Sequence, residues 1–570
     1  MLDAVDWSTA FGYLAVGASD ASGNGCCGNI GVDTMASLGT FRYASRRASE
    51  ARFGRLLSPM IAKSLSWLAL LLVISGTMLV TMERLSLGWL CGALAAVLYM
   101  AVKFYNWHVH DLPAGKGGSV DDLLAGDVLG RLSREPDVRE IAKVIGEVPS
   151  GQFMGVRLGM TPSFLATIAE SSTISVDELW SVADDIRQAN QLDRISGAVL
   201  AVALVRSFPN YQSIIAQTHL GDEDLDAGIL WQEHLMEIVR HFGQRRRTGG
   251  LARDWSFGWI PHLERFGQNI SEQIGASRNT LSIDIPSHVQ VIDQLVEAFG
   301  TGGRQNAVLI GQAGVGKTSV IHAFAERILD ADANVPENLR FRQIFILDSA
   351  SLIAAAPGRG ELENLIMQVL GEAYNAKNII VCLDDAQLFF EEGVGSVDLT
   401  NVLQPILDAG RLRLILSMDE QRYLEISRRN PSLANSLNRI NVAETNEAET
   451  KKVLQEQLIA IEFNRKVTYM IQAINEAYRL SQRYIHDIAM PGRALKLLES
   501  AASFSESGIV TMNSVQQAIE RTMDVKVSVA NTTEDRERLL HMEDLIHERM
   551  VNQVRAVNVV SDALRRARAG

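Results

Sequence analysis

The sequence predicts an α/β domain with a phosphate-binding loop, joined to an all-helical domain that follows a two-helix membrane hairpin. A glycine-rich loop ending in Lys-Thr lies at residues 311–318, between an apolar run and a helical pattern. Short apolar runs alternate with helical patterns around it, which is typical of a parallel sheet covered by helices on both faces. Two uncharged 18-residue runs lie nearer the N-terminus.

Length, charge and cysteine content narrow the class of protein. A chain of 570 residues predicts about three or four domains. A formal net charge of -13 argues against a general nucleic-acid binder, so no nucleic-acid partner is expected. The cysteines show no Cys-x-x-Cys pair, which favours a reducing compartment without a disulfide framework or structural zinc. They are Cys26, Cys27, Cys91 and Cys382.

The hairpin is predicted over residues 61–105. Its apolar runs, 65–82 and 85–102, are separated only by Glu83 and Arg84. As a helix, each run is about 27 Å long, close to the thickness of the hydrocarbon core. Residues 41–63 carry six basic side chains against a single glutamate, so the positive-inside rule places both ends in the cytoplasm. We expect two spans in the cytoplasmic (inner) membrane, with the lipid bilayer as a partner; a buried hairpin of a soluble helical domain is the alternative.

The segments before and after this hairpin differ in their predicted structure. Residues 1–60 predict a weakly ordered segment with a basic end, whereas residues 119–245 predict a helical domain. Ser175-Val-Asp-Glu reads as a capping box, and the nearly continuous apolar run 195–205 predicts the central buried helix. This domain shows no catalytic constellation, so a docking module for protein substrates or adaptors is the interpretation. Loops are predicted at Pro149, Pro162 and Pro209.

The phosphate loop has its expected context. Residues 306–310 predict a buried strand, and residues 319–328 predict a helix. In such a loop, backbone amides and the helix N-terminus hold phosphates, Lys317 contacts the β- and γ-phosphates, and Thr318 binds magnesium. We therefore predict ATP and Mg²⁺ as cofactors. The predicted nucleotide contacts are Gly311, Gly314, Val315, Gly316, Lys317, Thr318 and Ser319.

A second acidic motif follows the apolar run 378–383. Asp384 and Asp385 come directly after this predicted strand. Asp384 would hold magnesium, and Asp385 would orient the attacking water. Residues 344–347 and 412–416 predict further strands of the same sheet.

From the phosphate loop onward, the chain resembles the first ATPase ring of the Clp family of AAA+ unfoldases, such as ClpA, ClpB and ClpC. The resemblance rests on residues 347–363, with Arg-Gly-Glu-Leu-Glu at their end, on residues 398–412, and on Pro491-Gly-Arg. It implies an AAA+ large subdomain at 250–445 and a small helical subdomain at 446–530, with Arg493 as a further nucleotide contact. Residues 160–236 are similar to the Clp N-terminal helical repeat.

The resemblance also implies an assembly and an activity. Clp rings are hexamers that unfold or remodel proteins, so a homo-oligomer is expected. Residues 531–570 resemble the linker into a second ATPase ring and the first helix of that ring, so we expect a chain truncated before the second ring. A ClpP-like protease partner is expected only where a second ring exists.

Several positions depart from the family pattern. The pore-loop aromatic is replaced by Gly358, and the paired arginine fingers by Asn435 and Ser436. The first-sensor hydroxyl falls on Met418, and Asp385 stands where the family has glutamate. These changes predict a ring that binds ATP and hydrolyses it weakly. An ATP-gated membrane scaffold without unfolding activity, and an unrelated phosphate-loop switch, remain as alternatives. Imperfect substitutes adjoin two of these positions, namely Ser417 and Arg439.

Overall fold

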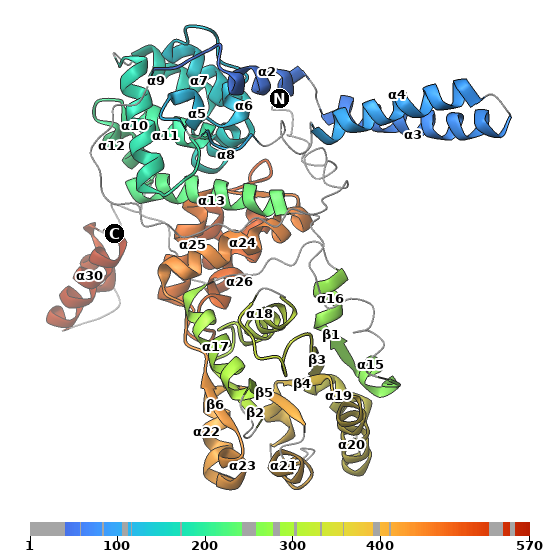
Figure 1. Cartoon of the computed structure of the whole chain (residues 1–570). Helices are drawn as coiled ribbons and strands as arrows, with labels where there is room; N and C mark the ends of the chain where they lie inside the picture. The colour runs from blue at the N-terminus through green and yellow to red at the C-terminus, as the bar shows by residue number, and fades with distance from the viewer. Residues whose placement is uncertain are drawn as a thin grey trace. The chain divides into compact units, whose positions relative to one another are not determined.

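A computed structural model of the chain divides into two compact units, residues 1–244 with 470–472, and residues 245–469 with 473–570. Figure 1 shows the elements of both units along the chain. The residues described are 40–56, 59–82, 85–104, 112–115, 117–171, 174–241, 258–276, 285–300, 305–330, 333–356, 358–390, 399–409, 412–523, 540–547 and 553–569. Cys26, Cys27, Glu83, Arg84 and Pro357 lie outside them.

In the first unit, two helices form the predicted hairpin, α3 (Pro59–Thr81) and α4 (Leu85–Phe104). Both are long and apolar enough to cross a membrane, judged by length and composition. They pack closely through glycines, because a Cβ on Gly88 would lie 3.0 Å from the Gly76 carbonyl oxygen. The outer surface is apolar, with Trp67 and Trp89 exposed by 66% and 75%.

The same unit contains a helical domain built around one buried helix. Every residue from Gly197 to Val205 of α11 (Gly197–Arg206) is buried, which confirms the predicted central helix. Its neighbours are short amphipathic helices whose apolar faces pack on it. They include α7 (Val138–Glu147), α8 (Pro149–Leu158), α9 (Pro162–Ser171), α10 (Val176–Ala189) and α13 (Asp222–His241), and the domain also holds α2 (Arg46–Leu56), α5 (Val120–Leu123), α6 (Gly126–Leu129) and α12 (Tyr211–Gln217).

The sequence signals at the helix starts predicted one capping box correctly and two proline positions wrongly. Ser175 forms the predicted capping box, in which its hydroxyl accepts from the Glu178 N–H and the Glu178 carboxylate accepts from the Ser175 N–H. The prediction that Pro149 and Pro162 lie in loops is wrong, since each is the first residue of a helix. Proline suits this position because the first helical N–H has no partner within the helix.

The second unit is built on a six-stranded sheet in the order β1-β3-β4-β5-β2-β6. All neighbouring pairs are parallel except β1 with β3, so the predicted fully parallel sheet is wrong at this edge. The edge strand has only three residues and no apolar pattern, which left no signal in the sequence. The strands are β1 (Gly267–Asn269), β2 (Asn306–Ile310), β3 (Gln343–Asp348), β4 (Ile379–Asp384), β5 (Arg413–Met418) and β6 (Asn438–Asn441).

Helices cover both faces of this sheet, as predicted. One core joins alternate strand residues such as Leu309 and Ile415 to α16 (Ile270–Ala276), α17 (Pro286–Gly300) and α18 (Lys317–Leu329). The other core joins Val308 and Leu414 to the helices of the opposite face. Those helices are α15 (Pro261–Phe266), α19 (Ser349–Ala355), α20 (Arg359–Ala376), η2 (Ala386–Phe389), α21 (Thr400–Ala409), α22 (Glu420–Arg429) and α23 (Pro431–Asn435).

A small helical subdomain follows the sheet. It comprises α24 (Glu447–Arg465), α25 (Ile471–Tyr484), α26 (Gly492–Ala501), η3 (Ala502–Phe504) and α27 (Met512–Met523), with β7 (Thr468–Tyr469) paired to β8 (Ile509–Val510). Among the described residues that follow it are the helices α29 (Met542–His547) and α30 (Val554–Ala569).

Candidate nucleotide-binding site

The phosphate loop connects the carboxyl end of β2 to the start of α18. Gly314 and Gly316 have φ angles of +86° and +95°, a region that side-chain-bearing residues rarely adopt. These two glycines let the chain curl so that helix α18 begins directly at Lys317. The first amides of a helix have no partner within it, so they suit an anion such as phosphate.

Lys317 lies over the loop that it terminates. Its ammonium donates to the carbonyl oxygens of Gly311 and Gln312, at 2.8 and 3.1 Å. Burial lowers the pKa of Lys317, while the carboxylates of Asp419, Asp385 and Asp384 oppose that shift. One cation therefore faces three carboxylates at the end of the sheet.

Asp384, the last residue of β4, and Asp385, the residue after it, lie next to the phosphate loop because β5 alone separates β4 from β2. The Thr318 hydroxyl donates to Asp384 Oδ2 at 3.1 Å. Asp385 is exposed, has a left-handed φ of 50°, and accepts from Gln387 Nε2 at 3.1 Å through its carboxylate. A hydroxyl beside a carboxylate offers the hard oxygen ligands that Mg²⁺ prefers.

The small helical subdomain contacts the phosphate loop through backbone atoms. The Ala489 N–H donates to the Ala313 carbonyl at 2.8 Å, and the Gly492 N–H donates to the Gly314 carbonyl at 3.1 Å. A Cβ on Gly492 would lie 2.7 Å from Gly314 Cα, so the contact requires glycine.

The side chain of Arg493, the next residue, is held by Ile485 of this subdomain and by Glu444, which precedes α24. Its guanidinium donates to the Ile485 carbonyl at 3.2 Å and pairs with Glu444 at 3.4 Å. Those bonds are to groups outside the phosphate loop, so its role as a nucleotide contact stays a prediction.

Two residues at the site were missed in the sequence. Asp419 follows β5 just as Asp385 follows β4, a signal that could have identified it. His288 is only 3% exposed, and its ring lies 3.4 Å from where a Gly316 Cβ would be. Burial lowers the pKa of His288. The sequence gave no signal for His288, because a single polar residue in an apolar helical pattern does not indicate a binding site.

Among the positions that depart from the family pattern, Met418 and Ser436 are buried, whereas Asp385 and Asn435 are exposed. Met418 is fully buried in the core, and its carbonyl accepts from the Gly311 N–H at 3.3 Å. The Ser417 side chain is also buried. Ser436 is 2% exposed, and its hydroxyl donates to the Leu433 carbonyl at 2.7 Å. Gly358 precedes the first residue of α20 as its N-cap.

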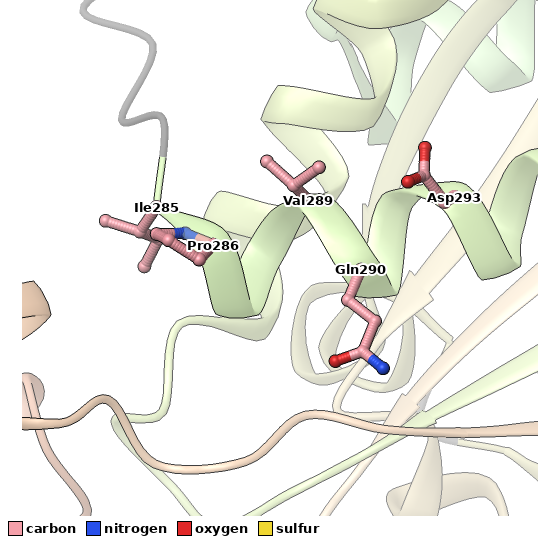
Figure 2. Close-up of a pocket in the computed structure, with 5 residues that line it drawn as sticks. All are labelled: Ile285, Pro286, Val289, Gln290 and Asp293. Atoms are coloured by element: carbon pink, nitrogen blue, oxygen red, sulfur yellow. The ribbon is translucent and has the colours of Figure 1, made fainter.

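A shallow hollow of about 390 Å³ lies elsewhere in this unit, along α17 (Figure 2). Four of its lining residues follow the i, i+3, i+4 and i+7 spacing of α17, and the fifth directly precedes the helix. None belongs to the phosphate loop or the acidic pair. They are Ile285, Pro286, Val289, Gln290 and Asp293.

Known proteins match about half of this chain. A family model described as an AAA lid domain matches residues 446–552. The chaperone ClpB of Oceanobacillus iheyensis is 28% identical over 345 residues, which cover 49% of this chain and 42% of that protein. The ClpC ATP-binding subunit of Staphylococcus aureus is 25% identical over 399 residues, covering 59% and 48%. An S. cerevisiae Hsp104–ADP complex is 28% identical over 53% of this chain and 52% of that one, with a TM-score of 0.44.

The phosphate loop, the mixed sheet and the helical lid define an AAA+ module. The matched relatives place it more narrowly, because the chain is a homologue of the Clp family of AAA+ proteins, ClpB, ClpC and ClpA among them. The chain spans less than half the length of these curated relatives.

Proposed function

We propose that the chain is a membrane-tethered, Clp-like ATP-binding subunit of a protein-remodelling hexamer, and that its ring binds ATP firmly but hydrolyses it weakly. The observation that carries the proposal is the pairing of Thr318 with Asp384 beside Lys317 on the glycine loop. The cradle for a magnesium–triphosphate group is complete in residue type, whereas the positions expected to speed hydrolysis are not.

The donor set fits ATP and Mg²⁺. The free amides at the start of α18 and the Lys317 ammonium would hold phosphate oxygens. Thr318 and Asp384 would hold the metal, which supplies charge neutralisation between the β- and γ-phosphates. Burial disfavours the charged form of Lys317, so a phosphate at this place would restore favourable surroundings for its charge.

Weak hydrolysis is expected from the residues around this cradle. An arginine finger contributes about 10³–10⁵ in rate, and neither Asn435 nor Ser436 carries a positive charge. The Ser436 hydroxyl is moreover committed to Leu433 inside the core. The Met418 thioether is buried and offers no hydroxyl. Asp385 keeps a carboxylate near the loop, so residual turnover is expected.

The hairpin supports a tether. Only 11% and 17% of the most apolar stretches of its two helices are buried, so most of the large apolar side chains keep much of their surface exposed. Exposed apolar surface of this extent is typical of contact with lipid. The basic residues before α3 support an orientation with both ends and the ATPase in the cytoplasm, and hence two spans of the cytoplasmic membrane.

Partners follow from the relatives. The matched proteins include chaperones and ATP-binding subunits of a Clp protease. By analogy, the helical domain around α11 would recruit protein substrates or adaptors. Association with a ClpP-like protease would require a second ring.

The test is sizing of the detergent-solubilised chain with and without ATP, alongside its hydrolysis rate. The proposal expects ATP to drive assembly to a hexamer, with turnover far below that of an active AAA+ ring. Identical oligomers with and without ATP, or turnover equal to an active ring, would contradict it.

The buried Met418 and Ser436 also favour a second candidate, an ATP-gated scaffold that recruits partners to the membrane without unfolding them. ATP-dependent capture of an unfolded model protein separates the two. Threading of that protein through the assembly supports the remodelling hexamer, and capture without threading supports the scaffold.

A further inference from the structure

The chain enters its membrane hairpin from a helix that is rich in arginine. Helix α2 (Arg46–Leu56) ends three residues before α3 begins, and it carries four arginines against one glutamate. The Arg46 side chain is 90% exposed, although its Nε pairs with Glu50 Oε1 at 2.9 Å. Phe53 is 52% exposed, and Arg55 lies exposed in the last turn. Arg42, just before the helix, is exposed as well.

Buried contacts fix this helix to the helical domain. The Ala51 carbonyl lies so close to Gly130 of the α6 end that a Cβ there would approach it to 2.8 Å. Ala48 and Ala51 are 2% and 4% exposed. Arg46 and Phe53 are seven residues apart on the side of α2 that faces away from α5 and α6, so these contacts keep both side chains exposed.

Arg47 links α2, which precedes the hairpin, to the segment that follows the hairpin. Its guanidinium is buried and donates to the Pro113 carbonyl at 3.0 Å and to the Asp121 carbonyl. Arg194 holds the same return segment by donating to the Leu112 carbonyl at 2.9 Å. The segments before and after the hairpin are thus anchored to one domain, which keeps the exposed arginines of α2 at its base.

We propose that four exposed side chains on α2 and just before it, Arg42, Arg46, Phe53 and Arg55, form a headgroup face that binds anionic phospholipids. This inference rests on the proposed membrane tether and adds the lipid class and the surface that recognises it. Arginine guanidinium groups pair with phosphate oxygens, and a partly exposed phenylalanine suits the acyl boundary just below them. Covalent continuity with α3 keeps this face close to any bilayer that the hairpin enters.

The test uses the full chain in bilayers that mix phosphatidylglycerol with phosphatidylcholine. After mild detergent extraction, the ratio of the two lipids that stay bound is measured by mass spectrometry. The wild type should enrich phosphatidylglycerol. In the double variant Arg46→Gln with Arg55→Gln, this enrichment should fall about five-fold per arginine at low salt. Arg46→Lys with Arg55→Lys should keep the enrichment, because it keeps the charge.

Arg134→Gln with Arg139→Gln is the matched control, since both arginines are exposed on the same domain and the net charge changes equally. Enrichment that is absent in the wild type, or lost equally in the control, would overturn the inference.

Carbonate extraction separates this inference from the tether. A chain that resists extraction but shows no lipid preference refutes only the headgroup face. A chain that is extracted, yet still floats with phosphatidylglycerol vesicles through Arg46 and Arg55, refutes only the tether.

Discussion

Replacement of Gly492 by alanine tests whether the lid contact shapes the phosphate loop. The added Cβ would lie 2.7 Å from Gly314 Cα and 2.8 Å from the Gly314 carbonyl oxygen. Both are backbone atoms, so the loop or the lid must move by several tenths of an ångström. Overpacking of this kind costs about 1–3 kcal/mol. The Gly492–Gly314 hydrogen bond is expected to weaken at the same time, at a cost of about 1 kcal/mol.

If the binding-competent loop is disfavoured by about 2 kcal/mol, the apparent affinity for ATP falls about thirty-fold. Titration of the full chain with a fluorescent ATP analogue measures this change. Helix propensity alone predicts that Gly492→Ala stabilises α26, because alanine favours a helix over glycine by about 1 kcal/mol. The close contact with Gly314 predicts destabilisation instead.

Gly371→Ala in α20 is the control, because a Cβ there would meet nothing within 4 Å. It should raise the melting temperature slightly and leave ATP affinity unchanged. If Gly492→Ala binds ATP as tightly as the wild type, the lid does not hold the loop in its binding conformation.

Three further predictions concern the same site. Lys317→Ala should abolish ATP binding, which equilibrium dialysis would detect; retained binding would contradict its assigned role. The pKa of His288 is lowered by burial, so the unfolded chain binds more protons below about pH 6.5 and stability should fall as pH drops through that region. Denaturant titrations of His288→Gln should show a weaker pH dependence than wild type, and an equal slope would refute this reading. Met418→Thr should lower stability by about 2–4 kcal/mol without raising the hydrolysis rate, because the position is fully buried. A variant with faster turnover would show that the threonine hydroxyl reaches the nucleotide.

The elements around the phosphate loop could be predicted because their signals are local. Apolar runs bounded by glycine or aspartate identified β2, β4 and β5 within a residue or two of their ends. The capping box at Ser175 was likewise readable, since Ser175 and Glu178 are three residues apart. Other features depend on residues far apart in sequence and leave no such trace.

Edge strand β1 is the clearest of these. It pairs with residues of β3 that lie about 78 positions away in the sequence, such as Ile346 opposite Gln268. The packing of helix α2 likewise depends on residues far away in the sequence, because the buried Arg47 donates to the carbonyls of Pro113 and Asp121. The sequence showed those arginines only as positive charge beside a membrane span.

The sequence by itself determined the class of site in this protein, because Gly311 to Thr318 and Asp384 are identifiable from residue type and spacing. The resemblance to the Clp family predicts which positions that support hydrolysis differ from the family pattern. Only the tertiary structure decided which groups meet. Parallel strand ends converge at one edge, so Thr318 reaches Asp384, Asp419 approaches Lys317, and the lid backbone packs on Gly314. Those contacts arise from packing over long sequence separations, which local pattern does not encode.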